Sequence, residues 1–212
     1  MSNRSERMGM INEILKGYED AASDGDFIRR LDGISSVDLL APVIEHFPQQ
    51  PSHVLDIGAG TGRDAAWLAS LSHTVVAVEP VDALRHAGIS KHKSPNISWV
   101  NDTLPQLWQT IALGKTFDVI LLCAVWQHLE DADRQIAFSA LRRLISENGK
   151  IIMSLRHGAG APTRPVFPAN VSDTVKWAEL QGFSKLDEVS TRSVQVQNHQ
   201  AGVTWTWLVF QA

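Results

Sequence analysis

An aspartate and three glycines stand together at the end of the first strongly apolar segment. Asp56 follows an apolar pair, and Gly58, Gly60 and Gly62 come after it at alternate positions. Glycines at this spacing let the backbone turn sharply and approach a ligand closely, because no Cβ stands in the way. A carboxylate just before such a loop would repel a phosphate and would suit an ammonium group. Arg63 also stands where the dinucleotide fingerprint has its third glycine, so the pattern predicts a ligand without a diphosphate.

The elements that must position these residues can be predicted from the hydrophobic pattern. Residues 54–57 read as a short buried strand and residues 64–69 as a helix, which is the first half of a nucleotide-binding βαβ unit. A second strand over 73–78 ends at Glu79, roughly 20 residues beyond the glycines, where a carboxylate can accept hydrogen bonds from both ribose hydroxyls. Alternatively, Asp56 and Glu79 are ordinary turn residues of an α/β domain.

The segment Leu55-Asp56-Ile57-Gly58-Ala59-Gly60-Thr61-Gly62 resembles the first motif of the class I S-adenosylmethionine-dependent methyltransferases. Over residues 54–155 the resemblance rests on recognisable motifs, and over the rest of the chain it rests only on the order of the predicted elements. It implies an α/β, doubly wound, Rossmann-like fold whose mostly parallel sheet has the strand order 3-2-1-4-5-7-6, with the last strand antiparallel. It also implies S-adenosylmethionine as cofactor, S-adenosylhomocysteine as product, and methyl transfer to an oxygen, nitrogen or carbon nucleophile.

On this resemblance, residues from several predicted loops bind the cofactor. Asp102 follows a third strand (97–100) and would accept a hydrogen bond from the adenine amino group, although an exposed loop carboxylate is the alternative. Arg63 could pair with the ligand's carboxylate or be a surface arginine. Tyr18 could cap the cleft or pack on its own helix, and Leu84 would line the adenine. The expected cofactor contacts are Tyr18, Asp56, Gly58, Ala59, Gly60, Arg63, Glu79, Pro80, Leu84, Asn101, Asp102, Thr103, Cys123 and Ala124.

His128 is the titratable group expected beside the reactive methyl, in the loop after the fourth strand. An imidazole there could take a proton from an attacking hydroxyl or amine, or it could have no chemical role. Trp126 in the same loop is expected to contact the substrate. Arg156, His157 and Arg164, after the fifth strand, could hold an anionic substrate group or belong to an ordinary mobile loop. A sulfonium methyl is already electrophilic, so alignment and exclusion of water should be the protein's main contribution.

The remaining pattern predicts one domain over residues 1–212, with an N-terminal helical cap over 1–50 and a Rossmann-like core over 51–212. Helices are expected over 8–22, where Asp24-Gly25-Asp26 ends the first, and from Ser36 as N-cap to Phe47. Later elements are a strand over 117–123, a helix capped by Asp131 that runs to Leu144, a strand over 150–155, a helix beginning at Asp173 and a closing strand pair. Trp205 and Trp207 alternate on one strand of that pair (183–189 and 203–210) and are expected in the core. Cys123 is expected to serve mainly as a small packing residue.

The composition of the chain limits the kinds of binding partner that we expect. The net charge of −4 leaves no basic footprint for nucleic acid or for an anionic membrane. The single cysteine, the lack of a membrane-length apolar run and an amino end (residues 1–7) without a signal-peptide core favour the cytoplasm. The eight histidines have no metal-ligand spacing, so no metal is expected. The chain also lacks the Pro-Pro-aromatic loop of base-amino methyltransferases, which favours a small-molecule acceptor.

Two other functions stay open at this point. The loop after the fourth strand has no diagnostic catalytic motif, so the chain could bind S-adenosylmethionine without catalysing transfer, as a sensor or partner subunit. An NAD(P)-dependent oxidoreductase is a further alternative, but Asp56 and Arg63 are unfavourable in a loop that binds diphosphate. Neither the oligomeric state nor the methylated atom follows from the sequence.

Overall fold

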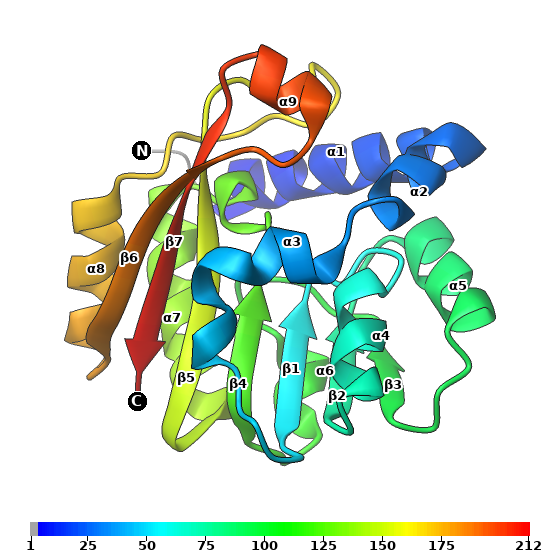
Figure 1. The fold of residues 1–212 in the computed structure, drawn as a ribbon. Coiled ribbons are helices and arrows are strands. Elements are labelled where there is room, and N and C mark those ends of the chain that lie inside the picture. Colours follow the sequence, from blue (N-terminus) through cyan, green and yellow to red (C-terminus); the bar gives the residue numbers. More distant parts are fainter. Residues whose placement is uncertain (1–3) are drawn as a thin grey trace.

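The computed structural model describes residues 4–212 and arranges its strands in one seven-stranded sheet with helices on both faces (Figure 1). The expectation for the amino end lies partly outside the described residues. The strands are β1 (His53–Ile57), β2 (Thr74–Val78), β3 (Ile97–Val100), β4 (Phe117–Leu122), β5 (Ile145–His157), β6 (Ser184–Arg192) and β7 (Thr204–Gln211). The helices are α1 (Arg4–Ala22), α2 (Gly25–Asp32), α3 (Ser36–Leu40), η1 (Ala41–His46), α4 (Arg63–Ser70), α5 (Asp82–Lys91), α6 (Trp108–Ala112), η2 (Trp126–His128), α7 (Asp131–Leu144), α8 (Val171–Leu180) and α9 (Val196–Gln200).

The strand order confirms the predicted fold. The order is β3-β2-β1-β4-β5-β7-β6, and β7 runs antiparallel to both β5 and β6. The order reverses direction between β1 and β4, which are parallel neighbours. In open α/β sheets, ligands bind beside the carboxyl ends of the strands at such a switch point. The fold therefore places the loops after β1 and β4 next to one another.

Side chains alternate along each strand and so divide the interior into two cores. In β1, Leu55 and Ile57 pack in the same cluster as Phe138 of α7, whereas Val54 packs with Leu68 of α4 on the other face. Because helices cover both faces, the central strands are buried on both sides, which explains their nearly continuous apolar sequences. No helix within residues 4–212 is long and apolar enough to span a bilayer.

The N-terminal helices lie across the carboxyl ends of the central strands (Figure 1). The helix α2 was not predicted, because Asp24-Gly25-Asp26 is also typical of the end of a helix. Asp24 is in fact the N-cap of α2, and its side chain accepts a hydrogen bond from the backbone N–H of Asp26 at 3.0 Å. Burial of Phe27 then holds this short helix against Tyr18 of α1, with ring centres 6.2 Å apart.

Several element boundaries also differ from the predictions. The cap of α3 is Ser35 rather than Ser36, and the helix changes to 3₁₀ geometry at Ala41, where the next residue is a proline. The helix α7 has Glu130 at its N-cap position, and α8 begins at Val171, after Asn170. The short helices α6 and α9 were not predicted, and β5 begins five residues earlier than Lys150, across an irregularity in its pairing with β4.

Candidate functional site

The glycine loop after β1 adopts a conformation that requires glycine. Gly58, Gly60 and Gly62 have φ angles of +71°, +57° and +77°. A Cβ on Gly58 would also lie 2.5 Å from a methyl carbon of Val125, in the loop after β4. The N–H groups of Gly58 and Ala59 both donate to the carbonyl of Val78, at 2.8 and 3.0 Å. The loop is therefore closed onto the end of β2, and these N–H groups are not available to cradle a diphosphate.

Two buried carboxyl groups flank this loop. Asp56 is only 2% exposed, and its Oδ2 has no hydrogen-bond partner among residues 4–212. Burial raises the pKa of Asp56 well above its usual range, with Asp64 and Glu79 adding to the effect and Arg63 opposing it. An unpaired buried oxygen is costly, so this atom is suited to a donor that a ligand would bring.

Glu79 holds the other side of the loop. Its Oε2 accepts the N–H of Gly60 at 2.7 Å, and its Oε1 accepts the N–H of Val81 at 2.8 Å. Burial raises the pKa of Glu79 to about 7, although these two backbone hydrogen bonds oppose the shift. Each carboxylate oxygen has a second lone pair, so Glu79 can still accept hydrogen bonds from a pair of hydroxyl groups.

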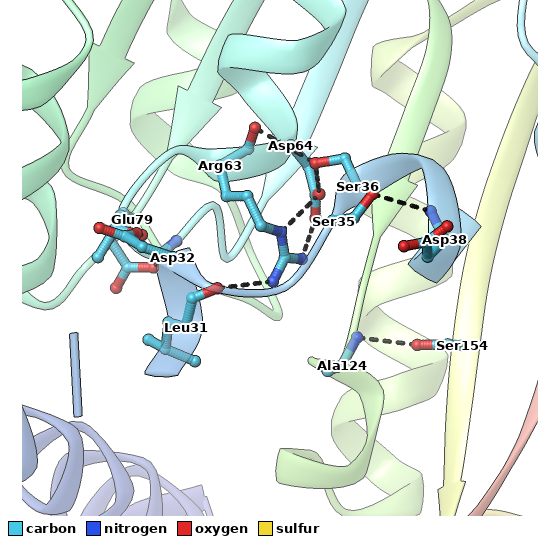
Figure 2. Close-up of polar contacts among 12 residues, drawn as sticks. Leu31, Asp32, Ser35, Ser36, Asp38, Arg63, Asp64, Glu79, Ala124 and Ser154 are labelled. Carbon is cyan, nitrogen blue, oxygen red and sulfur yellow. Dashed lines mark hydrogen bonds and ion pairs between the residues drawn. The ribbon is translucent and has the colours of Figure 1, made fainter. Parts of the chain in front are cut away.

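Arg63 ties the last turn of α2 to the first turn of α4 (Figure 2). Its guanidinium donates to both carboxylate oxygens of Asp64, at 2.9 and 2.6 Å, and to the carbonyl of Leu31 at 3.2 Å. The hydroxyl of Ser36 donates to the same carboxylate at 2.7 Å. The alternative that Arg63 is a surface arginine is wrong, because its side chain is only 18% exposed and is paired with Asp64, whereas its contact with the ligand's carboxylate stays a prediction.

A cavity of about 190 Å³ opens at the switch point between β1 and β4. It brings together most of the residues expected to bind the cofactor, from segments far apart in the sequence. Those lining residues are Tyr18, Gly58, Gly60, Glu79, Pro80, Leu84, Asp102, Thr103, Cys123, Ala124 and His128. We call this space the first cavity.

The N-terminal helical cap over the cofactor cleft and the contact from Tyr18 were predicted, but the other residues of α1 that line the first cavity were not. Ile11, Ile14 and Leu15 line it together with Tyr18. The sequence does carry a signal, because these residues share one face of a helix, but such a face more often packs on a core. Leu31, in the last turn of α2, completes this side. Hence the N-terminal helices form a wall of the first cavity.

Four residues of the expected cofactor set lie outside the lining of the first cavity. They are Asp56, Ala59, Arg63 and Asn101. Asp56 and Ala59 adjoin it through their neighbours in the glycine loop, whereas Asn101 is exposed. Asp102 lines the cavity, but its carboxylate also accepts the N–H and the hydroxyl of Thr110, both at 2.8 Å, and so fixes α6.

His128 and Tyr18 form a hydrogen-bonded pair at the end of the first cavity. The imidazole Nδ1 lies 3.0 Å from the carbonyl oxygen of Pro165, which can only accept, so Nδ1 carries the proton. Nε2 is then an acceptor, and the Tyr18 hydroxyl donates to it at 2.9 Å. Burial lowers the pKa of His128 to about 4, with Arg164 and Arg156 contributing. His128 is therefore neutral, and its unprotonated nitrogen is oriented by two contacts.

A second cavity of about 470 Å³ adjoins the first and shares Tyr18, Leu31, Ala124 and His128 with it. Its other walls are polar and basic, and they come from α2, from the loop after β5 and from α9. They include Arg30, Gln127, Arg156, Arg164, Asn198 and Trp205. The shared residues make the His128–Tyr18 pair the boundary between the two spaces.

Three expectations about side chains near the substrate need correction. Trp126 is fully buried against Phe138, with ring centres 5.0 Å apart, and it belongs to the core rather than to either cavity. His157 donates to or accepts from the Thr206 hydroxyl at 2.8 Å and also lies outside both linings. Trp205, expected in the core, lines the second cavity, whereas Trp207 is buried as predicted. Sequence alternation alone could not separate these two tryptophans, because both lie on the same face of β7 and differ only in their position along the strand.

Outside the two cavities, three of the described residues form a cluster whose side chains are of the kinds that bind metal ions. Glu45, His46 and Asp187 can bring one ligand atom each within 4.8 Å of the others. Nε2 of His46 already lies 2.9 Å from the Asp187 carboxylate, and Glu45 is 81% exposed. The hydrogen bond lowers the pKa of Asp187, as expected for an ion pair.

Comparison with known proteins agrees with this geometry. A family model described as a methyltransferase domain matches residues 54–149. An uncharacterised methyltransferase of Alkaliphilus oremlandii is 30% identical over 100 residues, which are 47% of this chain and 44% of that protein. A second, from Bacillus thuringiensis, is 26% identical over 134 residues, 63% of this chain and 58% of its own length. The chain thus spans about half the length of these curated relatives.

Solved structures of low sequence identity share the fold. The 1,6-didemethyltoxoflavin-N1-methyltransferase of Burkholderia thailandensis, solved with 1,6-didemethyltoxoflavin and S-adenosylhomocysteine bound, has a TM-score of 0.72 at 17% identity and covers 100% of this chain and 91% of its own. The magnesium protoporphyrin IX methyltransferase of Synechocystis, with S-adenosylmethionine bound, has a TM-score of 0.62 at 16% identity, covering 92% and 79%.

Proposed function

We propose that the chain is a class I S-adenosylmethionine-dependent methyltransferase that transfers the methyl group of S-adenosylmethionine to a nucleophile on a small molecule. The observation that carries the proposal is the first cavity, where an unpaired buried Asp56 oxygen and the Glu79 carboxylate flank a glycine loop. This combination suits a ligand with a cationic amino-acid tail and a ribose.

We assign the cofactor contacts by chemistry. Asp56 would attract the ammonium group, and Glu79 would accept hydrogen bonds from the ribose hydroxyls. Leu84 and Leu104 give the cavity apolar walls for the adenine, and Asp102 lies on the same lining to accept from its amino group. Gly58 and Gly60 let the backbone come close to the ligand, because their φ angles leave no room for a strain-free side chain.

S-adenosylmethionine supplies an electrophilic methyl on a cationic sulfur. The acceptor forms a bond to the methyl carbon as the carbon–sulfur bond breaks, and the electron pair of that bond goes to sulfur. The protein's task is to align the acceptor from the second cavity and to exclude water. The Tyr18 hydroxyl donates to Nε2 of His128, so it would relay the proton: it accepts the proton that the nucleophile releases while its own proton passes to Nε2.

We also propose that residues 1–212 act as one domain, because α1 and the β1 and β4 loops together line the first cavity. A small-molecule acceptor is supported by the 470 Å³ volume of the second cavity, within the range of ordinary ligand pockets. The cytoplasm stays the proposed compartment, on the ground of the unpaired Cys123.

One observation favours a second candidate function. A pKa of about 4 makes His128 a weak base, which would also suit a protein that binds S-adenosylmethionine without catalysing transfer. Calorimetry with S-adenosylhomocysteine and NAD tests the cofactor, and a metabolite screen with a labelled methyl donor tests turnover. We expect binding of S-adenosylhomocysteine alone and label transfer to a small molecule. Binding without any transfer would favour the second function, and binding of NAD would contradict both.

A further inference from the structure

The second cavity has a strongly one-sided charge. Arg30, Arg156 and Arg164 all line it, whereas its lining contains no aspartate or glutamate. Within residues 4–212, no carboxylate lies within ion-pair distance of these three guanidinium groups. Because the whole chain carries a net charge of −4, this local excess of positive charge is not a consequence of composition. It indicates a partner with negative charge.

Aromatic rings hold two of the guanidinium groups in place. The guanidinium carbon of Arg164 lies 5.0 Å from the ring centre of Tyr18 and 4.8 Å from that of Phe27. The corresponding distance from Arg156 to Trp205 is 5.5 Å. A guanidinium that stacks through its face keeps its N–H groups free for hydrogen bonds in its own plane. Both arginines are thus positioned before any ligand arrives.

The chain is also shaped to bring Arg164 to this place. Gly17 of α1 lies under the loop that carries Arg164, and a Cβ on Gly17 would lie 1.9 Å from the carbonyl oxygen of Thr163. A glycine therefore lets the loop backbone pack directly on α1. The next residue of α1, Tyr18, then supplies the ring on which Arg164 stacks.

Arg156 has unused hydrogen-bonding capacity. Its side chain donates to the carbonyl of Ala159 at 2.6 Å and to the Asn198 side chain at 3.2 Å. Its Nε is buried and has no hydrogen-bond partner among the described residues. Burial also lowers the pKa of Arg156, which is the direction expected for a cation without enough compensation. An anion in the second cavity would offset that cost.

We propose that the methyl acceptor is a planar aromatic acid, whose carboxylate is bound by Arg156 and Arg164 and whose ring packs among Phe27, Tyr18 and Trp205. This inference rests on the proposed function and names the substrate class for it. The nucleophile would be a hydroxyl or amino group on the same ring, directed towards the boundary formed by Ala124 and His128. The carboxylate would also offset the positive field of the two arginines, and so favour transfer of the released proton to His128.

The test compares aromatic acids with their carboxamides on the protein saturated with S-adenosylhomocysteine. The probes are 2-hydroxybenzoate, 4-hydroxybenzoate and 2-aminobenzoate, each paired with the amide that keeps the ring and the nucleophile. Calorimetry measures affinity, and mass spectrometry measures methyl transfer from S-adenosylmethionine. We expect at least one acid to bind about 10-fold or more tightly than its amide, which is the effect of losing a hydrogen bond to a charged group.

Variants then assign the effect to the cavity. Arg164→Gln and Arg156→Gln should each weaken binding of that acid about 10-fold, and Arg164→Lys should restore part of it, while affinity for S-adenosylhomocysteine is unchanged. Arg142→Gln is the matched control, because Arg142 also stacks on a ring, that of Phe183 at 5.7 Å, but lies outside both cavities.

Amides that bind as tightly as the acids, or no acid bound to protein that holds S-adenosylhomocysteine, would overturn the substrate class while leaving the proposed function intact. An acid affinity that Arg164→Gln does not change would also overturn it. A protein that does not bind S-adenosylhomocysteine would instead fail the proposed function. The first titration therefore separates the two failures.

Discussion

The two cavities meet at Tyr18 and His128, yet they carry opposite charges. The first is lined by the Glu79 and Asp102 carboxyl groups and by apolar side chains, and the second by three arginines and several amides. S-adenosylmethionine is a cation at both its sulfur and its ammonium group, so it matches the first cavity and would be repelled by the second. On the proposed function, this difference would sort the two ligands by charge before the methyl is transferred.

The cavities also differ in how the chain builds them. The glycine loop and Glu79 of the first cavity come from two consecutive strand ends, within one βαβ unit. The second cavity is assembled from α2, η2, the loop after β5, and α9, and these elements lie far apart in the sequence. Only the first arrangement leaves a local sequence pattern.

Substitution of His128, at the boundary between the two cavities, should have the largest effect. We expect His128→Ala to lower turnover about 100-fold, because general base catalysis by a positioned side chain contributes at least this much. Affinity for S-adenosylhomocysteine should stay within a few-fold of the parent. Steady-state kinetics and calorimetry measure the two quantities. His53→Ala is the control, since His53 is exposed at the opposite end of β1. Unimpaired turnover in His128→Ala would remove its role as base.

Substitutions that neutralise the carboxylates at the first cavity should weaken cofactor binding. We expect Asp56→Asn and Glu79→Gln each to weaken S-adenosylhomocysteine binding about 10- to 100-fold, the cost of losing a hydrogen bond to a charged group. Asp56→Asn should at the same time raise the melting temperature of the free protein, because the buried, unpaired carboxylate no longer has to ionise.

The same control and the same contradicting outcome apply to the Asp56 and Glu79 substitutions. Glu147→Gln removes an exposed carboxylate from the chain and should change neither quantity. Unchanged affinity in both Asp56→Asn and Glu79→Gln would show that the ligand does not use this loop.

A change of pH should alter ligand affinity in the first cavity but not in the second, and this effect should be smaller than those of the substitutions above. Burial raises the pKa of Glu79 to about 7, and ribose hydroxyls donate best to its ionised form. Binding of S-adenosylhomocysteine should therefore release protons, and affinity should rise by up to about 10-fold per pH unit below pH 7 and level off above it. The second cavity should show no such change between about pH 6 and pH 8, because guanidinium groups stay protonated and His128 stays neutral.

Titrations in two buffers of different ionisation enthalpy measure this proton release directly. Affinity that falls as the pH rises would reverse the sign that we assign to Glu79. A strong pH dependence of aromatic-acid binding over the same range would show that a group other than the arginines controls the second cavity.

The smallest expected effect concerns the ring under Arg156. Trp205→Leu should weaken aromatic-acid binding about 2- to 10-fold, the contribution of one aromatic contact, and leave cofactor affinity unchanged. Trp207→Leu, two residues along the same strand, should instead lower the unfolding free energy by about 2–4 kcal/mol, because Trp207 is buried. Thermal unfolding and calorimetry compare the two, and equal effects on stability would return Trp205 to the core.

The contrast between the cavities explains what could be predicted from the sequence. Asp56, the glycines and Glu79 could be found because their spacing reflects a strand end, a tight turn and a second strand end. The strand order followed from the family resemblance. The burial of Arg63 could not be predicted, because one of its two partners, the Leu31 carbonyl, lies more than thirty positions away in the sequence.

Other residues were misplaced for related physical reasons. Trp126 follows a strand as a substrate contact would, but only tertiary packing shows that Phe138 covers it. The helix α2 was missed because Asp24 and Gly25 suit both the end of one helix and the start of the next. The wall contributed by α1 was visible as an apolar face, but no sequence pattern distinguishes a face that lines a ligand cavity from one that packs on a core.

A crystal structure of the protein with S-adenosylhomocysteine tests the central claim most directly. We expect the ligand in the first cavity, with its ammonium group at the Asp56 carboxylate, its ribose on Glu79 and its sulfur directed towards His128. A first cavity that stays empty at saturating ligand, or that takes up a dinucleotide instead, would contradict the account.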